Sequence, residues 1–564
     1  MNIQDNSAFN KLWQASYNKF GIEDLQIPTN ITNLVDILQP SIDKNTDKTA
    51  VSMGAASINY SQLDRAAHQF ASFLQAQQVP KGTRIAVQLP NILQYPAILL
   101  GCLHAGVILV NVNPLYTHYE LAHQVEDSQA KILVIFDAMR GAYDNLADHI
   151  KSQLNMVIVC SMEKFEGLDS DLSLMMSPVE SKSSELKIND NKEVRFANIL
   201  SHYSANQFKT VETNLNDVAL FQYTGGTTGK AKGAMLTHRN LVANVLQSYS
   251  FFGKGLENKT NGQVKVLNPL PLYHIFSFTV CGLLSIYGGW EDILITNPRD
   301  IDGLVNTIET KHPAMIPSVN TLFAGMLQHP KFATLDFSNF HFAVGGGTAI
   351  IADIARKWHE VTGKPINEGY GMSETSPVIS FNPMGVESFT GTVGIPVSHT
   401  DILILDEHDN PCKIGEKGEV CVKGPQVTQG YWGKDNSNTF TKDGYFRTGD
   451  IGFINEEGNL TLVDRKKDMI IVSGFNVYPN EVEAALTEHP KVFEVGVIGI
   501  PNEKSGEAPK AYIVAADDSL TPEELAEFAK ERLTGYKRPS SYKFIEELPK
   551  SAVGKILRKE LRKM

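Results

Sequence analysis

Cysteine is scarce in this chain of 564 residues, and no two of its five cysteines are spaced as a CxxC pair. This pattern argues against a disulfide framework or a clustered cysteine metal site, so we expect reduced core thiols in a cytoplasmic protein. The N-terminus has no basic segment followed by an apolar core, and we expect no signal peptide. The most apolar stretches, which begin at Tyr95 and Ile275, are interrupted or too short to cross ~30 Å of hydrocarbon. Both are therefore predicted to be buried helix-to-strand units.

An excess of basic residues is also missing. The chain has 51 Lys+Arg against 63 Asp+Glu, a net charge of -12, which argues against nucleic acid as its main partner. Hydrophobic residues make up 42% of the sequence, enough for large buried cores. Because the length exceeds that of one ordinary domain, we expect at least two domains.

Apolar strand-like runs alternate with helical patterns along most of the chain. RIAVQL, VILVNV, AKILVIF and MVIVC are such runs, and they predict a first, largely parallel α/β segment from about residue 49 to 211. A second α/β segment is predicted from about 218 to 382, followed by short strands of a small β-rich unit. The fold class is thus α/β: a large N-terminal domain of two α/β subdomains plus a small β-rich unit, 1–463, and a smaller mobile α+β C-terminal domain, 464–564.

Two helix starts are predicted in the C-terminal domain from capping chemistry. Asn480 with Glu483 is one, and Thr521 with Glu524 is the other. The charged run DRKKD, which begins at Asp464, marks the domain boundary, although a run of this kind also suits a solvated turn.

A glycine- and threonine-rich loop, YTGGTTGKAKG, begins at Tyr223. It is not a Walker A loop, because Thr224 stands five residues before Gly229 and Ala231 follows Lys230. The Rossmann spacing fails as well. Exposed amide groups between glycines can cradle phosphate oxygens, and a flexible linker is the alternative.

Three further motifs are hard to explain as scaffold. GYGMSET, from Gly369, offers an aromatic ring at Tyr370 between two permissive glycines, with the carboxylate of Glu374 close behind. RTGD ends at Asp450, which could accept both hydroxyls of a ribose or simply be a turn residue. At the C-terminus, PKSAVGKILRKELRKM predicts that Lys555 opens a basic helix, with a frayed solvated tail as the alternative.

Taken in order, these motifs with SGFNVYPNEVE closely resemble the acyl-adenylate-forming (ANL) superfamily, which includes acyl-CoA synthetases, carrier-protein adenylation domains and luciferases. The resemblance covers the chain from about residue 30 to its end. YTGGTTGKAKGAMLTHRN and LPLYHIFSF look most like bacterial long-chain fatty acid–CoA ligases.

The resemblance implies a nucleotide site and assigns its residues. Thr224 and Glu374 would bind Mg²⁺, Tyr370 would stack on adenine, Asp450 would hold the ribose and Arg465 would approach ribose and phosphate. The residues implied to bind ATP or AMP are Tyr223, Thr224, Gly225, Gly226, Thr227, Thr228, Gly229, Lys230, Lys232, Gly345, Gly346, Gly347, Gly369, Tyr370, Gly371, Met372, Thr375, Asp450 and Arg465.

The same resemblance implies two half-reactions. A fatty carboxylate attacks the α-phosphorus of ATP, and coenzyme A then takes the acyl group from the adenylate. Lys555 would bridge carboxylate and α-phosphate in the first step, with Glu374 and His274 as further catalytic residues. Because coenzyme A must reach the carbonyl that Lys555 covers, the family rotates its C-terminal domain, here about Asp464.

Rotation would bring the coenzyme A path, Ser473, Gly474 and Phe475, to the site. His274 is placed at the acyl site, although it could be a satisfied core histidine. Phe278 stands where some relatives have a gating tryptophan, and it could be an acyl-tunnel plug or plain core packing.

The leading interpretation is therefore an ATP-dependent long-chain fatty acid–CoA ligase. Medium-chain or aryl acid–CoA ligases and a fatty-acid–AMP ligase remain alternatives, as does a non-catalytic binding protein. The expected partners are a fatty acid, ATP and CoA, with Mg²⁺. The insoluble substrate suggests peripheral contact with the inner face of the cytoplasmic membrane, and the resemblance is compatible with a homodimer.

Overall fold

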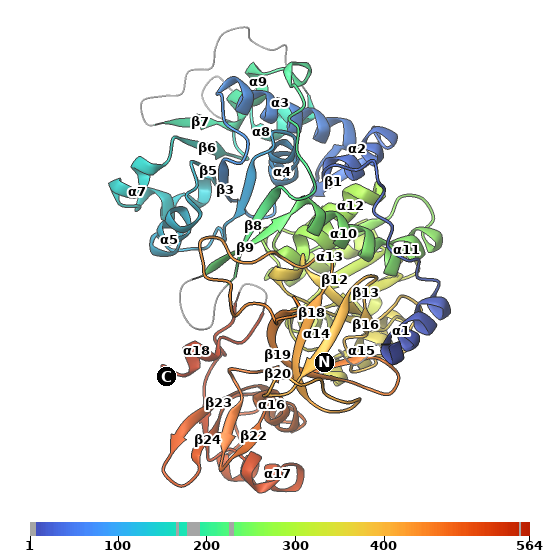
Figure 1. Cartoon of the computed structure of the whole chain (residues 1–564), viewed down its shortest axis with the longest axis vertical. Coiled ribbons are helices and arrows are strands. Elements are labelled where there is room, and N and C mark those ends of the chain that lie inside the picture. The colour runs from blue at the N-terminus through green and yellow to red at the C-terminus, as the bar shows by residue number, and fades with distance from the viewer. Residues whose placement is uncertain (1–6, 165–168, 178–191, 225–230, 552–553) are drawn as a thin grey trace.

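The computed structural model describes residues 7–164, 169–177, 192–224, 231–551 and 554–564. Figure 1 shows a large body formed by residues up to β20 and a small domain below it, which carries the C-terminus. Among the described residues, no helix combines the length and apolarity needed to cross a bilayer.

The first sheet has seven strands in the order β7-β6-β5-β3-β4-β8-β9, and only the β8–β9 pair is antiparallel. The four runs predicted as strands form β3 to β6, because their residues are buried on both faces, as central parallel strands require. The strands are β3 (Arg84–Gln88), β4 (Ile108–Asn111), β5 (Ile132–Phe136), β6 (Met156–Cys160), β7 (Glu193–Arg195), β8 (Val218–Thr224) and β9 (Lys232–Thr237).

The second sheet has nine strands in the order β16-β15-β14-β13-β12-β10-β11-β1-β2. Neighbouring strands from β14 to β1 in this order pair in parallel. At the edges, β2 pairs antiparallel with β1, and β15 pairs antiparallel with β14 and β16. The strands are β1 (Thr49–Met53), β2 (Ala56–Asn59), β10 (Lys265–Asn268), β11 (Glu291–Leu294), β12 (Met315–Ser318), β13 (Phe342–Gly345), β14 (Ile366–Gly371), β15 (Val378–Phe381) and β16 (Ile395–Pro396).

The predicted division at residue 211 between the two α/β segments is wrong. β1 pairs in parallel with β11 of the second sheet, whereas β8 pairs with β4 of the first. Each sheet therefore takes strands from the other's stretch of sequence, and β8 and β9 bring the two ends of the predicted phosphate loop to the edge of the first sheet.

Helices cover both sheets. The continuous stretch α10 (His238–Ser248), η3 (Tyr249–Gly253) and α11 (Lys254–Lys259) contains a π-helical turn, and a second π-helix, η4 (Ser277–Leu283), leads into α12 (Leu284–Gly288). The other helices of the large domain are α1 (Ser7–Phe20), α2 (Val35–Lys44), α3 (Tyr60–Ala76), α4 (Gln94–His104), α5 (His118–Ser128), α6 (Gly141–Asp144), α7 (Asp148–Gln153), α8 (Asp171–Met176), α9 (Phe196–His202), α13 (Ile301–Lys311), α14 (Asn320–Gln328) and α15 (Ala352–Thr362).

The β-rich unit is a four-stranded antiparallel sheet of β17 (Asp401–Leu405), β18 (Gly418–Lys423), β19 (Phe446–Ile454) and β20 (Leu460–Arg465). The small domain packs three helices against a five-stranded sheet. Its elements are β21 (Ile470–Val472), β22 (Phe475–Val477), α16 (Pro479–Thr487), β23 (Val492–Asn502), β24 (Gly506–Ala515), α17 (Pro522–Arg532), β25 (Ser541–Phe544) and α18 (Arg558–Leu561).

The helix starts of the small domain bear out one capping prediction and correct the other. The hydroxyl of Thr521 accepts the Glu524 N–H at 3.2 Å, so Thr521 caps α17 as predicted. Asn480 does not cap α16, because that helix already begins at Pro479. Instead, the Asn480 N–H donates to the carboxylate of Asp464 at 2.7 Å. The predicted basic helix is likewise shorter than expected: α18 begins at Arg558, and Lys555 precedes it.

Candidate active site

The base of the glycine- and threonine-rich loop is a strand pair. Thr224 of β8 lies opposite Lys232 of β9, so the two ends of the loop are held together. The Tyr223 hydroxyl donates to Asp127 at 2.8 Å, and the Lys232 ammonium lies 5.4 Å from the centroid of the Tyr431 ring. Six of the residues predicted to bind ATP lie outside the described residues: Gly225, Gly226, Thr227, Thr228, Gly229 and Lys230.

Tyr370, Asp450 and Arg465 come together from three strands. The Tyr370 hydroxyl of β14 donates to Asp450 Oδ2 at 2.6 Å, and Asp450 Oδ1 lies 3.4 Å from Arg465 Nε. Asp450 and Arg465 are direct partners in the β19–β20 register. Burial, and secondly the Asp450 charge, raises the pKa of Tyr370, so the phenol keeps its proton. The Asp450 carboxylate thus contacts a hydroxyl donor, Tyr370, and a permanently charged guanidinium, Arg465.

The glycines around Tyr370 have a packing role that the sequence did not reveal. A Cβ at Gly369 would lie 2.3 Å from the Phe381 ring, and one at Gly371 would lie 2.2 Å from the Pro377 carbonyl oxygen. Tyr370 is 8% exposed. The prediction that these glycines leave an accessible aromatic face is therefore wrong; they let β15 pack tightly against β14.

Glu374 sits in the short helix η6 (Ser373–Thr375), directly after β14. Its Oε1 accepts the Tyr431 hydroxyl at 2.6 Å, and its carbonyl oxygen accepts the Thr428 N–H at 2.7 Å. Within the same turn, the Met372 N–H donates to Thr375 Oγ1 at 3.2 Å. Burial raises the pKa of Glu374, and the Tyr431 hydrogen bond partly offsets this. Because η6 contacts β8 and β9, Glu374 lies beside the base of the phosphate loop.

The predicted adenine segment follows β13 and lies against β14. A Cβ at Gly346 would lie 3.2 Å from the Phe276 ring and 3.5 Å from the Gly369 carbonyl oxygen, so only glycine fits comfortably there. Gly345 is similarly crowded, and Gly347 has a φ of +77°, which favours glycine. Glu368, which sequence reasoning did not single out, accepts the Ile350 N–H at 3.2 Å and ties this segment to β14.

His274 and Phe278 flank the start of the second π-helix. The Phe276 N–H donates to His274 Nδ1 at 3.3 Å, so the neutral ring carries its proton on Nε2. Burial, and secondly the charge of Lys555, lowers the pKa of His274 to about 4, which keeps the ring neutral at pH 7. Phe278 is 1% exposed and belongs to the largest core cluster.

Lys555 reaches this site from the small domain. A bridge between Lys550 and Ile556 closes a turn in which the Ser551 N–H donates to the Lys555 carbonyl oxygen at 2.8 Å. At the tip, a Cβ on Gly554 would lie 2.9 Å from Thr321 Oγ1 of α14, so the turn packs directly on the large domain.

The charged residues that shift the pKa of Lys555 include Arg465 and Asp450, which belong to the nucleotide site predicted above. Burial, then repulsion by Arg465, lowers its pKa to about 8, and attraction by Asp450 partly opposes the shift. Across the described parts of the chain, the Lys555 ammonium has no ion-pair partner within 4.0 Å. The structure therefore brings Lys555, His274, Asp450 and Arg465 into one neighbourhood.

Asp464 is the second-last residue of β20, just before the chain enters the small domain. Its carboxylate accepts backbone N–H groups from Arg465 and Asn480, each at 2.7 Å, and lies 3.8 Å from Arg558 Nη1. Burial raises its pKa, and the Arg558 charge partly opposes this.

Ser473, Gly474 and Phe475 are not part of this neighbourhood. Ser473 and Gly474 form the turn between β21 and β22, with φ of +51° and +84°. The Phe475 ring is 55% exposed and stacks on Tyr536 at a centroid distance of 4.7 Å. In Figure 1, β22 lies farther from the large domain than α18 does.

Tyr431 is a site neighbour that was not predicted from the sequence. It lies in the loop between β18 and β19, 57 residues after Glu374, and no local motif announces their contact. Next to it, the Trp432 Nε1–H donates to the Asp127 carbonyl oxygen at 3.0 Å. The loop between β18 and β19 is thereby held beside the strand pair at the base of the phosphate loop.

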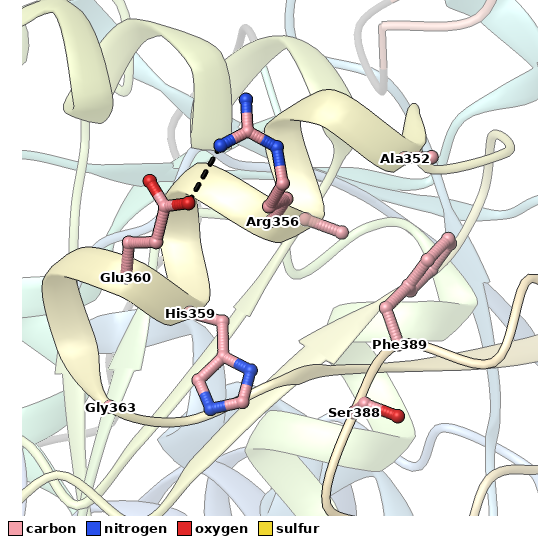
Figure 2. Close-up of a pocket in the computed structure, with 8 residues that line it drawn as sticks. Ala352, Arg356, His359, Glu360, Gly363, Ser388 and Phe389 are labelled. Atoms are coloured by element: carbon pink, nitrogen blue, oxygen red, sulfur yellow. Dashed lines mark hydrogen bonds and ion pairs between the residues drawn. The ribbon is translucent and has the colours of Figure 1, made fainter.

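Two cavities lie outside the centre of the site. Figure 2 shows the larger, 620 Å³, between α15 and a loop with Ser388 and Phe389, where Arg356 pairs with Glu360. The second, 480 Å³, adjoins the base of the phosphate loop and is lined by His123, Glu126, Asp127, Ala231, Lys232 and Lys434.

Two family models match most of the chain. The AMP-binding enzyme family matches residues 38–432, and the C-terminal domain of AMP-binding enzymes matches 481–555. The chain belongs to this family. Its two matched parts contain Tyr370 and Glu374 on one side and Lys555 on the other.

Similar proteins cover nearly the whole chain. A long-chain-fatty-acid–CoA ligase of Escherichia coli O6:H1 is 43% identical over 95% of both chains, and one of Bacillus subtilis is 35% identical over 98% of this chain and 97% of its own. A feruloyl-CoA synthase of Amycolatopsis is 31% identical over 91% of this chain and 95% of its own. The ATP-bound crystal structure of MatB from Rhodopseudomonas palustris superposes with a TM-score of 0.81 at 26% identity, covering 94% of this chain and 98% of that one. The α/β fold with a large N-terminal and a small C-terminal domain is thereby confirmed.

Proposed function

We propose that this protein is an ATP-dependent long-chain fatty acid–CoA ligase, which forms acyl-CoA, AMP and pyrophosphate through an acyl-adenylate. The observation that supports this most is the near full-length similarity to long-chain-fatty-acid–CoA ligases, at 40–43% identity in several bacteria. The chain also contains Glu374, Asp450, Arg465 and Lys555. Both attacking groups come from substrates, so the protein's contribution is positioning and charge stabilisation.

In the first half-reaction, a carboxylate oxygen of the fatty acid attacks the α-phosphorus, and the bond to the departing pyrophosphate breaks. The ammonium of Lys555, which the structure leaves without a counter-ion among the described residues, balances the negative charge that grows there. Asp450 accepts the ribose hydroxyls and Arg465 stabilises the phosphate side. A neutral His274 beside Lys555 can donate its Nε2–H without adding charge.

Mg²⁺ fits the residues around the phosphate loop. Glu374 and Thr224 supply a carboxylate and a hydroxyl oxygen, the hard ligands that Mg²⁺ prefers, from neighbouring elements. When bound, the ion neutralises phosphate charge. A bound cation would also favour the charged form of Glu374, whose pKa burial raises.

In the second half-reaction, the thiolate of coenzyme A attacks the acyl carbonyl and AMP leaves. A Lys555 ammonium that bridges carboxylate and α-phosphate would cover the carbonyl that coenzyme A must reach, so we propose that the 464–564 domain rotates about Asp464 between the half-reactions. The turn at Ser473, Gly474 and Phe475 would then line the coenzyme A path. The half-exposed Phe475 ring and the positive φ of Gly474 support an exposed turn that a ligand can reach.

Aryl acids are a second candidate substrate class, because the feruloyl-CoA synthase of Amycolatopsis is 31% identical. The deciding experiment is ATP–pyrophosphate exchange across acids of different length, followed by CoA-dependent AMP release. Palmitate should support both steps with the highest kcat/KM. A preference for ferulate or a C8 acid would overturn the long-chain assignment.

Peripheral contact with the cytoplasmic membrane and a homodimer are finer proposals. The insoluble substrate motivates the first. Co-sedimentation with anionic vesicles tests membrane contact, and light scattering tests the dimer. Equal pelleting with neutral and anionic vesicles, or a monomeric mass, would contradict the respective proposal.

A further inference from the structure

The segment that carries His274 is held by buried side chains of the first α/β layer. Asn91 Oδ1 accepts the Leu272 N–H at 2.8 Å, and Asn91 Nδ2 donates to the Leu270 carbonyl oxygen at 2.8 Å. Asn91 follows β3 of the first sheet, whereas Leu270 and Leu272 follow β10 of the second. One amide thus fastens the two sheets together immediately before His274.

A second attachment starts from the strand that leads into the phosphate loop. Gln222 of β8 donates from Nε2 to the Tyr273 carbonyl oxygen at 3.0 Å, and its Oε1 accepts from Asn111 Nδ2, also at 3.0 Å. Asn111 Oδ1 in turn accepts the Tyr95 hydroxyl at 2.5 Å. That hydroxyl also lies 3.2 Å from the Leu272 carbonyl oxygen, so the network closes on the same segment.

All four network side chains are shielded from water. Asn91 is 4% exposed, Tyr95 1%, Asn111 3% and Gln222 4%. Each buried amide must find partners inside the protein, and removing one partner leaves the other unsatisfied. The network therefore favours one position of the segment from Leu270 to Tyr273. Apolar side chains of the same size would not specify that position by hydrogen bonds.

The positions of the two ends give the network a functional meaning. Gln222 stands two residues before Thr224, and Tyr273 directly precedes His274. A displacement of one end moves either the groups that face the triphosphate or those that face the carboxylate. A misplacement of ~1 Å between reacting groups can cost ~100-fold in rate.

We infer that Asn91, Tyr95, Asn111 and Gln222 are positioning residues for adenylate formation, which hold the His274 segment in register with the phosphate-loop strand. This inference rests on the proposed function. The residues touch no substrate atom; they act through the backbone of Leu270, Leu272 and Tyr273. Their effect should fall on kcat of the first half-reaction, because both substrates still bind but are less well aligned.

The test compares Gln222→Met with a matched control, Gln69→Met. Gln69 on α3 is also buried, and its Nε2 donates to the carbonyl oxygens of Leu200 and Tyr203 at 2.8 and 3.0 Å, within the first layer. Gln222→Met should lower kcat of ATP–pyrophosphate exchange by about 30- to 100-fold with KM values within about threefold. Gln69→Met should keep kcat within about threefold, although both variants lose a buried donor.

Tyr95→Phe is the milder variant, because it removes only a hydroxyl and keeps the ring. Its kcat for ATP–pyrophosphate exchange should fall by about three- to tenfold. Its melting temperature should stay within a few degrees of the wild-type value. Thioester formation from supplied acyl-adenylate should stay near wild type in both network variants. Equal losses in Gln222→Met and Gln69→Met, or equal losses in both half-reactions, would overturn the inference. Failure of the wild-type protein to form any acyl-CoA would instead contradict the proposed function.

Discussion

The two sides of the candidate site are built in opposite ways. On the large-domain side, Tyr370, Asp450 and Arg465 contact one another on three strands, so their positions are fixed before a substrate arrives. On the small-domain side, Lys555 stands on a short turn whose tip at Gly554 touches α14. Its ammonium finds no ion-pair partner in the described part of the chain.

Under the proposed function, this difference suits different tasks on the two sides. A prebuilt donor and acceptor set suits the nucleoside, which both half-reactions need. A cation that has no ion-pair partner within 4.0 Å among the described residues suits a charge that exists in only one of the two half-reactions. The catalytic side chain can then leave without breaking an ion pair of its own.

The largest effect should come from removing the Lys555 ammonium. Lys555→Ala should lower the rate of adenylate formation by about 10³-fold, because a preorganised charge at the developing anion is lost. Thioester formation from supplied acyl-adenylate should change by less than about tenfold. Both rates are measured by rapid quench.

Lys559→Ala is the matched control, because this exposed lysine lies on α18 of the same tail. It should leave both half-reactions unchanged. Equal losses of the two half-reactions in Lys555→Ala would remove the division of labour between the two sides.

The tail that carries Lys555 is anchored within its own domain by Arg558. This guanidinium pairs with both carboxylate oxygens of Glu483 at 2.8 Å, and the Glu483 side chain is only 13% exposed. Arg558→Met should lower the free energy of unfolding by about 3–5 kcal/mol, because it leaves a largely buried carboxylate without its cation. Urea denaturation followed by circular dichroism measures the change.

The exposed pair between Lys563 and Glu560 provides the comparison for Arg558. Lys563→Met should change stability by less than about 1 kcal/mol. If Arg558→Met were equally mild, the tail would not be fixed to its domain by this pair.

The large-domain side of the site should respond differently from the side that carries Lys555. Asp450→Ala removes the acceptor proposed for the ribose and leaves Tyr370 and Arg465 without their partner. We expect KM for ATP to rise by about 10- to 100-fold in the exchange reaction, because hydrogen bonds to charged groups are worth about 1.5–3 kcal/mol. KM for the fatty acid should stay within about threefold of wild type. An unchanged KM for ATP would contradict the ribose role.

Strands and helix caps that are set by neighbouring residues in the chain were predictable from the sequence. The strands β3 to β6 follow from apolar runs, and the Thr521 cap follows from its spacing to Glu524. The start of α16 was not predicted correctly, because the Asn480 N–H donates to Asp464, which lies 16 residues earlier on another element. The exchange of strands between the two sheets was missed for the same reason: strand pairing is a tertiary choice.

The candidate site was found through recognised motifs, and the residues without a motif were missed. Tyr431 donates to Glu374, and Glu368 anchors the glycine segment after β13; neither has a local signature. The tight packing at Gly369 and Gly371 depends on Phe381 and Pro377, which sequence patterns do not place opposite them. Most of the phosphate loop lies outside the described residues, so its predicted contacts remain predictions.

The charge state of Lys555 tests the central claim most directly. Burial and Arg465 lower its pKa to about 8, and the ammonium is charged below that value and neutral above it. kcat/KM for ATP–pyrophosphate exchange with palmitate should therefore fall above pH 8 in the wild-type protein, since this ratio follows the free enzyme. Lys555→Arg, whose side chain stays charged, should keep its lower activity without that decline up to about pH 10. The same alkaline decline in both proteins would show that another group is responsible, and the account of Lys555 as the delivered charge would fail.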